Sequence, residues 1–243
     1  VQLGYQNRLD DRILFQVVAS SDKKVFNLGG DLAYFIELVE SGNREGLRNY
    51  GRQCIDIQYA SVTHYDIPFT TITLVEGEAL GGGFEAALSA NVVVAEQSAR
   101  FGFPEITFGM FPGMGALSLL IRKIAPGMVR RVIMDHRVYT ASELYEIGVV
   151  DVLAPDGEGR TAVKDYIQEH IAHAPGHYGF QAAIDIANPL SRSELLEIVD
   201  LWVEASMNLS EKNLRLMAYF SRAQARRHIR PESMSGITDY YSA

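Results

Sequence analysis

The sequence has little of several features that define common protein classes. Its single cysteine, Cys54, cannot form an internal disulfide or a cysteine-built metal site, which favours a reducing compartment, so we expect a cytoplasmic protein. No apolar run reaches the length of about 18 residues that a membrane-spanning helix needs. Lysine and arginine number 22 against 30 aspartates and glutamates, and this net charge of −8 argues against a general nucleic-acid binder.

Two common catalytic signatures are also missing. The chain contains no GxSxG motif of a nucleophilic serine and no HExxH motif of a zinc enzyme, and its six histidines lie in ordinary polar contexts. We therefore expect neither serine nor metal chemistry, and we expect no cofactor.

What the chain does have is an unusual stretch from Leu80 to Gly115. Three consecutive glycines follow an apolar run, 71–75, that reads as a strand, and they precede a helical pattern. Such a turn exposes backbone N–H groups at a helix N-terminus and lets another molecule approach the backbone closely. The pattern predicts a site for a polarised carbonyl oxygen or an anion.

Two isolated glutamates lie in this stretch among apolar residues. Glu85 is in the first turn of the predicted helix, and Glu105 follows a proline in FGFPE. Two carboxyl groups beside backbone donors suit general acid/base catalysis on a carbonyl compound. The residues alone leave simpler interpretations open, since Glu85 could only complement the helix dipole and Glu105 could be an exposed loop residue.

The motifs GGGFE, VVVAE, FGFPE and FPGMG resemble, in this order, those of the crotonase (enoyl-CoA hydratase/isomerase) superfamily. The resemblance implies that Glu85 and Glu105 are the acid/base pair. It also implies that the N–H groups of Gly30, in FNLGGDL, and Gly82 form an oxyanion hole. The expected fold is α/β, a crotonase-like spiral of repeated ββα turns with a C-terminal helical region.

Within the superfamily, FNLGGDL, ALGGGFEAALS and LWVEASMNLSEKNLR look like segments of diffusible signal factor synthases. This resemblance implies a substrate pocket that includes Leu80, Gly81, Met114 and Trp202. It also implies the activity: dehydration of a 3-hydroxyacyl group on acyl carrier protein, then thioester hydrolysis, which releases a cis-2-unsaturated fatty acid used in quorum sensing. The enzyme would thus be a dehydratase (lyase) with thioesterase (hydrolase) activity.

Two other functions stay open at this point. One is an enoyl-CoA hydratase or isomerase that acts on coenzyme A thioesters, and the other is a binding protein held by the receiver domain of a sensor kinase. The resemblance implies a homo-oligomer, a trimer or a dimer of trimers. Four arginines near the end of the last predicted helix either complement that helix end or contact the acidic acyl carrier protein: Arg222, Arg226, Arg227 and Arg230.

The strand and helix patterns divide the chain into a core with the active site, 1–155, and a C-terminal helical region, 156–243. The resemblance implies that this region covers the pocket and makes oligomer contacts. The family begins with a strand pair, but only one strand-like run, 13–19, is visible. We therefore expect either that the N-terminal segment with the first strand is missing or that a loop near 7–11 interrupts the pair. A long helix is predicted over 42–65, and another over 193–227 with a break near 208–210.

Two helix starts are predicted from capping residues. Asp31 precedes a helical pattern that begins near Leu32, and Asp is a favoured N-cap residue. Thr140 is followed three residues later by Glu143, which is the signature of a capping box. We place Cys54 in the core as a small buried residue.

Overall fold

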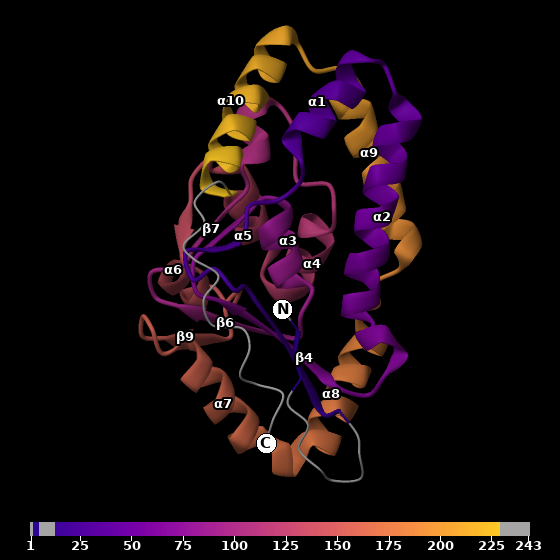
Figure 1. Cartoon of the computed structure of the whole chain (residues 1–243). Helices are drawn as coiled ribbons and strands as arrows, with labels where there is room; N and C mark the ends of the chain where they lie inside the picture. Colours follow the sequence, from indigo (N-terminus) through magenta and orange to yellow (C-terminus); the bar gives the residue numbers. More distant parts are fainter. Residues whose placement is uncertain (1, 5–12, 229–243) are drawn as a thin grey trace, which may run out of the picture.

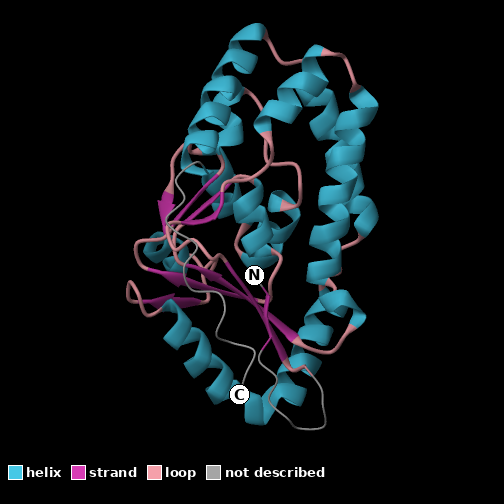
Figure 2. Ribbon diagram, in the orientation of Figure 1, coloured by secondary structure: helices cyan, strands magenta, loops and turns pink. Residues whose placement is uncertain are grey.

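The computed structural model describes residues 2–4 and 13–228, with side chains from 13 to 225. Two sheets form the centre of the molecule, and helices surround them (Figures 1 and 2). The larger sheet has the strand order β1-β2-β4-β6-β9, and the smaller sheet has the order β3-β5-β7-β8. Within the part of the chain that the structure describes, α/β architecture is therefore confirmed.

The larger sheet is parallel except at one edge. Its strands are β1 Gln2–Gly4, β2 Phe15–Ala19, β4 Thr70–Val75, β6 Val92–Glu96 and β9 Val152–Ala154. Every residue of β6 is buried, as are the last five of β4. A parallel strand covered on both faces needs an almost continuous apolar run, which explains why these two strands were visible in the sequence.

The chain alternates between the two sheets as it advances. The smaller sheet contains β3 Val25–Asn27, β5 Glu78–Leu80, β7 Arg100–Gly102 and β8 Tyr139–Thr140. Thus β2, β4 and β6 enter the larger sheet, and each is followed by a short strand in the smaller one. A helix follows the first two of these strand pairs, and this repetition is the ββα spiral that the resemblance predicted.

The expectation of a missing first strand was wrong. β1 pairs antiparallel with β2, with Leu3 opposite Val17. A strand of three residues is too short to show the alternation that identifies a strand in sequence, so pairing with β2 stabilises it. The loop residues 7–11 that we associated with the missing strand lie outside the described residues.

The helices account for most of the remaining chain. They are α1 Leu32–Glu40, α2 Arg44–Val62, α3 Gly82–Leu88, α4 Ala116–Lys123, α5 Pro126–Met134, α6 Ala141–Glu146, α7 Gly159–His170, α8 Ala174–Ala187, α9 Arg192–Met207 and α10 Glu211–His228, with three short 3₁₀ turns, η1 His64–Asp66, η2 Pro104–Phe108 and η3 Ile171–His173. The break predicted near 208–210 separates α9 from α10. After β9, the described part of the chain contains helices and no further strand.

Capping explains where several helices begin. The Asp31 side chain accepts a hydrogen bond from the Tyr34 N–H, which confirms Asp31 as the N-cap of α1. Thr140 and Glu143 form the predicted reciprocal capping box of α6. The helix predicted over 42–65 is shorter than expected, because α2 ends at Val62 and is followed by η1, whose residues have positive φ.

One apolar cluster joins the two ends of the chain. It brings together residues from α1, α2, the segment 108–114 and the C-terminal helices α9 and α10: Leu32, Phe35, Leu38, Leu47, Ile55, Phe108, Met110, Met114, Leu195, Val199, Trp202, Val203 and Met217. α2 and α9 lie side by side in Figure 1. The C-terminal helices therefore pack directly against the part of the chain that carries the predicted site.

Candidate active site

Glu85 lies in α3, directly behind the glycine turn. Its side chain is only 1% exposed. Its Oε1 accepts hydrogen bonds from the backbone N–H groups of Met114 (2.8 Å) and Ala116 (3.1 Å). Burial raises the pKa of Glu85 to about 7, although these two hydrogen bonds oppose the rise. The turn 113–115 thus fixes the carboxyl group in one orientation.

Glu105 lies in η2, after the short strand β7. Its buried Oε2 has no hydrogen-bond partner among the described residues. Burial and, next in size, the charge of Glu85 raise the pKa of Glu105 to about 8. The two carboxyl groups therefore interact, and both have pKa values suited to proton transfer near neutral pH.

The glycine turn makes room for Glu105. Gly81 has a φ of +54°, and a Cβ built on it would lie 2.4 Å from the Glu105 Oε1. A side chain at position 81 would therefore strain the backbone and collide with the carboxyl group. We predicted Gly81 as a substrate-binding residue, and in the structure it contacts a predicted catalytic group.

The two predicted oxyanion glycines lie close together. A Cβ on Gly82 would be 3.6 Å from the Gly30 backbone nitrogen, so the two loops are in contact. The first loop is held by the Asn27 side chain, which accepts from the Gly29 N–H at 2.8 Å, and by the Gln224 amide of α10, which donates to the Leu28 carbonyl at 2.8 Å. This arrangement can place two backbone donors around one oxygen atom.

A cavity of about 220 Å³ brings most of the predicted residues together. Seven of the eight predicted site residues line it: Gly30, Gly81, Gly82, Glu85, Glu105, Met114 and Trp202. Leu80 does not line it. Leu80 borders a neighbouring cavity of about 370 Å³ between η2, the 136–138 loop and α10, because its side chain leaves β5 on the face opposite to Ala79.

The sequence analysis missed the contribution of α2 to this cavity. Tyr50, Cys54 and Gln58 line it from one face of α2. Cys54, which we placed in the core, is half-buried at the cavity wall. The spacing of four residues was visible in the sequence, but nothing local indicated that this face meets the glycine turn.

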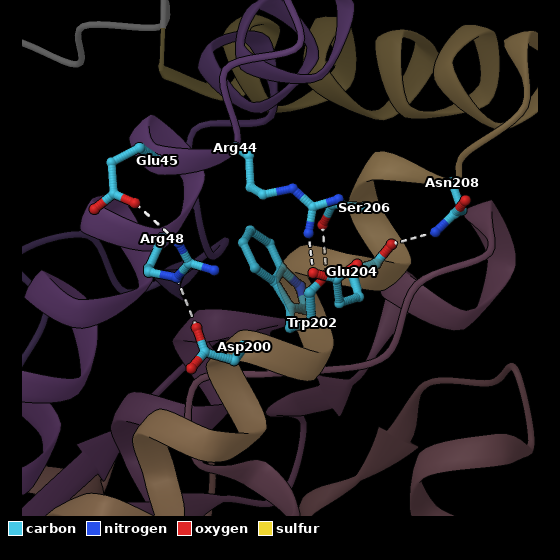
Figure 3. A network of polar contacts seen from close by, with 8 residues as sticks. All are labelled: Arg44, Glu45, Arg48, Asp200, Trp202, Glu204, Ser206 and Asn208. Atoms are coloured by element: carbon cyan, nitrogen blue, oxygen red, sulfur yellow. Dashed lines mark hydrogen bonds and ion pairs between the residues drawn. The ribbon is translucent and has the colours of Figure 1, made fainter.

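Trp202 closes the cavity from α9. Its ring packs edge-on against Phe35 at 5.2 Å between ring centroids. A Cβ on Gly113 would lie 2.5 Å from the indole, so only glycine fits there. α9 is tied to α2 by two ion pairs on either side of this tryptophan, Arg44 with Glu204 and Arg48 with Asp200 (Figure 3).

Neither a metal site nor a membrane span is seen in the described residues. No group of three or more histidine, cysteine, aspartate or glutamate side chains there could hold a metal ion. No described helix is long and apolar enough to cross a membrane.

The raised pKa values predict how stability depends on pH. Both glutamates bind protons more tightly in the folded state than at their ordinary pKa of 4.5. Their contribution to stability is complete below about pH 4.5 and is lost as pH rises through about 7 to 8. We expect the free energy of unfolding to fall over this window, and urea unfolding at about pH 5 and pH 8.5 measures it.

The double variant Glu85→Gln/Glu105→Gln isolates this effect from other titrating groups, such as the buried His64, whose pKa burial lowers. The double variant should gain stability relative to the wild type as pH rises. An equal pH dependence in both proteins would contradict the assignment of buried, protonatable carboxyl groups.

Comparisons with known proteins place the chain in one family. The family model described as "Enoyl-CoA hydratase/isomerase" matches residues 6–195. A putative enoyl-CoA hydratase of Thermus thermophilus is 26% identical over 86% of this chain and 81% of that protein. The chain spans 61% of the short-chain-enoyl-CoA hydratase of Clostridium acetobutylicum and 22% of the fatty acid oxidation complex subunit alpha of Pseudomonas syringae.

Solved structures show the same fold. The enoyl-CoA hydratase of Bacillus halodurans superposes with a TM-score of 0.71 at 20% identity, over 84% of this chain and 82% of that one. Pseudomonas aeruginosa DspI superposes with a TM-score of 0.54 at 25% identity, over 90% and 78%. The chain belongs to the enoyl-CoA hydratase/isomerase family of the crotonase superfamily.

Proposed function

We propose that this chain adds water to, or eliminates it from, the C2–C3 bond of an acyl thioester. The observation that carries the proposal is the pair of buried glutamates in one cavity, with pKa values raised to about 7 and about 8, beside two glycine turns. A purely regulatory binding protein would not need two buried carboxyl groups, whose ionisation burial opposes.

The roles follow from the hydrogen bonds. The thioester oxygen would bind between the N–H groups of Gly30 and Gly82, and loss of one such donor typically costs about 3 kcal/mol of transition-state stabilisation. In hydration, Glu85, held by two backbone donors, accepts a proton from water, and the water oxygen attacks C3. Glu105, with the higher pKa, gives its proton to C2. Dehydration runs through the same steps in reverse, with the protonation states exchanged.

A second candidate goes further along the same chemistry. After eliminating water from a 3-hydroxyacyl group, the enzyme would hydrolyse the thioester and release a free cis-2-unsaturated acid, as diffusible signal factor synthases do. One glutamate would then activate a water molecule for attack on the carbonyl carbon, and the carrier would leave as its thiol. The positions of Met114 and Trp202 in the cavity wall support this candidate, since the resemblance to those synthases implies both as pocket residues.

The proposal includes self-association through the helical region. Family members are commonly oligomeric, and α2 and α9 expose Ile57 (71%) and Leu201 (64%) on the outside of the molecule. We propose a trimer or a pair of trimers. The following experiment compares coenzyme A and acyl carrier protein as carriers of the acyl group.

Mass spectrometry of one reaction mixture separates these candidates. The purified protein is incubated with a 3-hydroxydodecanoyl group on acyl carrier protein and, in parallel, on coenzyme A. A dehydrated acyl group that stays on its carrier supports the hydratase reaction. Free cis-2-dodecenoic acid supports the synthase reaction. No turnover of either thioester, together with no hydration of crotonyl-coenzyme A, would contradict the proposed function.

A further inference from the structure

One wall of the cavity is polar, although most of its lining is apolar. Tyr50, Cys54 and Gln58 are four residues apart on α2, so they share one face of the helix, and all three line the cavity. The glycine turns and both glutamates line it as well, from the other elements that surround it. The hydratase chemistry proposed above assigns no role to this polar stripe.

The three residues follow one another along the path of a substrate. A Cβ on Gly30 would lie 3.1 Å from the Tyr50 hydroxyl, so Tyr50 is beside the oxyanion turn. Cys54 is close enough to Glu85 for the charge of the carboxyl group to act on the thiol.

Gln58 follows Cys54 about 6 Å further along the axis of α2, at a rise of about 1.5 Å per residue. Beyond it, Ser61 contacts Ser89 at the end of α3 (Oγ–Oγ 3.1 Å). Gln58 therefore lies on the side of Glu85 away from the oxyanion turn.

Gln58 has hydrogen-bonding capacity that the protein does not use. Its side chain is 8% exposed, and its amide makes no hydrogen bond to a residue within the described ranges. The other buried, uncharged polar side chain among the described residues that line the cavity, Ser206, already donates to the Trp202 carbonyl at 2.8 Å. The amide of Gln58 is not among the fully buried polar atoms that lack a partner in the described residues, so it is accessible from the cavity, where a bound molecule or water can hydrogen-bond to it.

The charges around the cavity restrict the partner. Among the described residues that line it, none is a lysine, an arginine or a histidine, and two are glutamates. A carboxylate on the substrate would be buried here without a counter-ion. A neutral hydroxyl group can both accept from and donate to an amide, and it carries no charge.

We propose that the acyl group bound in this cavity carries a hydroxyl group beyond C3, which hydrogen-bonds to Gln58. This inference rests on the proposed function, because it assumes that the thioester lies in the oxyanion turn. It specifies a substrate class, oxygenated acyl thioesters, that the two glutamates alone do not define. Cys54 and Tyr50 form the polar edge between that hydroxyl group and the reacting carbons.

Binding of inert analogues tests the inference without turnover. The probes are octanoyl-pantetheine analogues in which a methylene group replaces the thioester sulfur, either unsubstituted or with one hydroxyl group at C5, C6, C7 or C8. Titration calorimetry gives Kd for each probe with the wild type and with Gln58→Met, which keeps the shape of the side chain and removes the amide. We expect one hydroxylated probe to bind the wild type about tenfold more tightly than the unsubstituted probe, and we expect Gln58→Met to abolish this preference.

Gln181→Met makes the same chemical change at a half-buried position of α8 outside the cavity, where the amide donates to Asp185, and it should keep the wild-type preference. If no hydroxylated probe binds more tightly than the plain one, Gln58 is satisfied by water alone and the inference fails. It also fails if Gln58→Met retains the preference. If the wild type preferred a hydroxylated probe but turned over no acyl thioester, that result would instead contradict the proposed function.

Discussion

Glu105→Gln should lower kcat by about 10²–10⁴-fold, the usual contribution of a general acid or base. The amide keeps the size of the side chain but cannot give a proton to C2. Its buried Oε2 has no partner among the described residues, so the change to an amide breaks no hydrogen bond at that atom. Glu85→Gln should have an effect of similar size, and its amide oxygen can still accept from Met114 and Ala116.

The measurement is steady-state turnover of the thioester that the wild type prefers, with urea unfolding of each variant as the test of folding. Glu146→Gln, on the exposed face of α6, is the matched control and should behave as the wild type. A well-folded Glu105 variant that retained more than about a tenth of the wild-type kcat would contradict the catalytic assignment.

Gly81→Ala should also abolish most of the activity, for a different reason. Its Cβ would lie 2.4 Å from the Glu105 Oε1 in a backbone conformation with a φ of +54°. The φ strain alone costs about 1–2 kcal/mol. The collision displaces the carboxyl group, and a shift of about 1 Å in a reacting group can cost about 10²-fold in rate.

Gly157→Ala separates the two causes. Gly157 has a φ of +82°, and nothing lies within 4 Å of a Cβ built on it. Gly157→Ala should lose about as much folding stability as the positive φ costs Gly81→Ala, and it should keep its activity. If Gly81→Ala and Gly157→Ala had equal activity, contact between the glycine turn and Glu105 would not matter for catalysis.

The glutamates and the glycine turn could be predicted because their signal is local. Glu85 and Glu105 each lie next to the residues that bury them, and the buried strand β4 leads into the turn through the short β5. The sequence could not show that Leu80 borders the neighbouring cavity, because the direction of a side chain on a three-residue strand is set by pairing with β3 and β7. Strands β3 and β7, which pair with β5, are themselves only three residues long.

The parts that could not be predicted depend on distant segments. Gln58 reaches the cavity only because α2 packs between α1 and α9, far apart in sequence. The Gln224 contact with the oxyanion loop joins residues nearly at opposite ends of the described chain. The first strand, β1, has a partner in β2 but no pattern of its own.

That Gln224 contact has a thermodynamic consequence. The amide of α10 donates to the carbonyl groups of Leu28 and Gly30, so the position of the terminal helix and the shape of the oxyanion turn are coupled. Coupling between two sites is reciprocal. If a thioester binds in the turn as proposed and orders it, binding stabilises the docked helix by the same free energy with which the docked helix improves thioester binding.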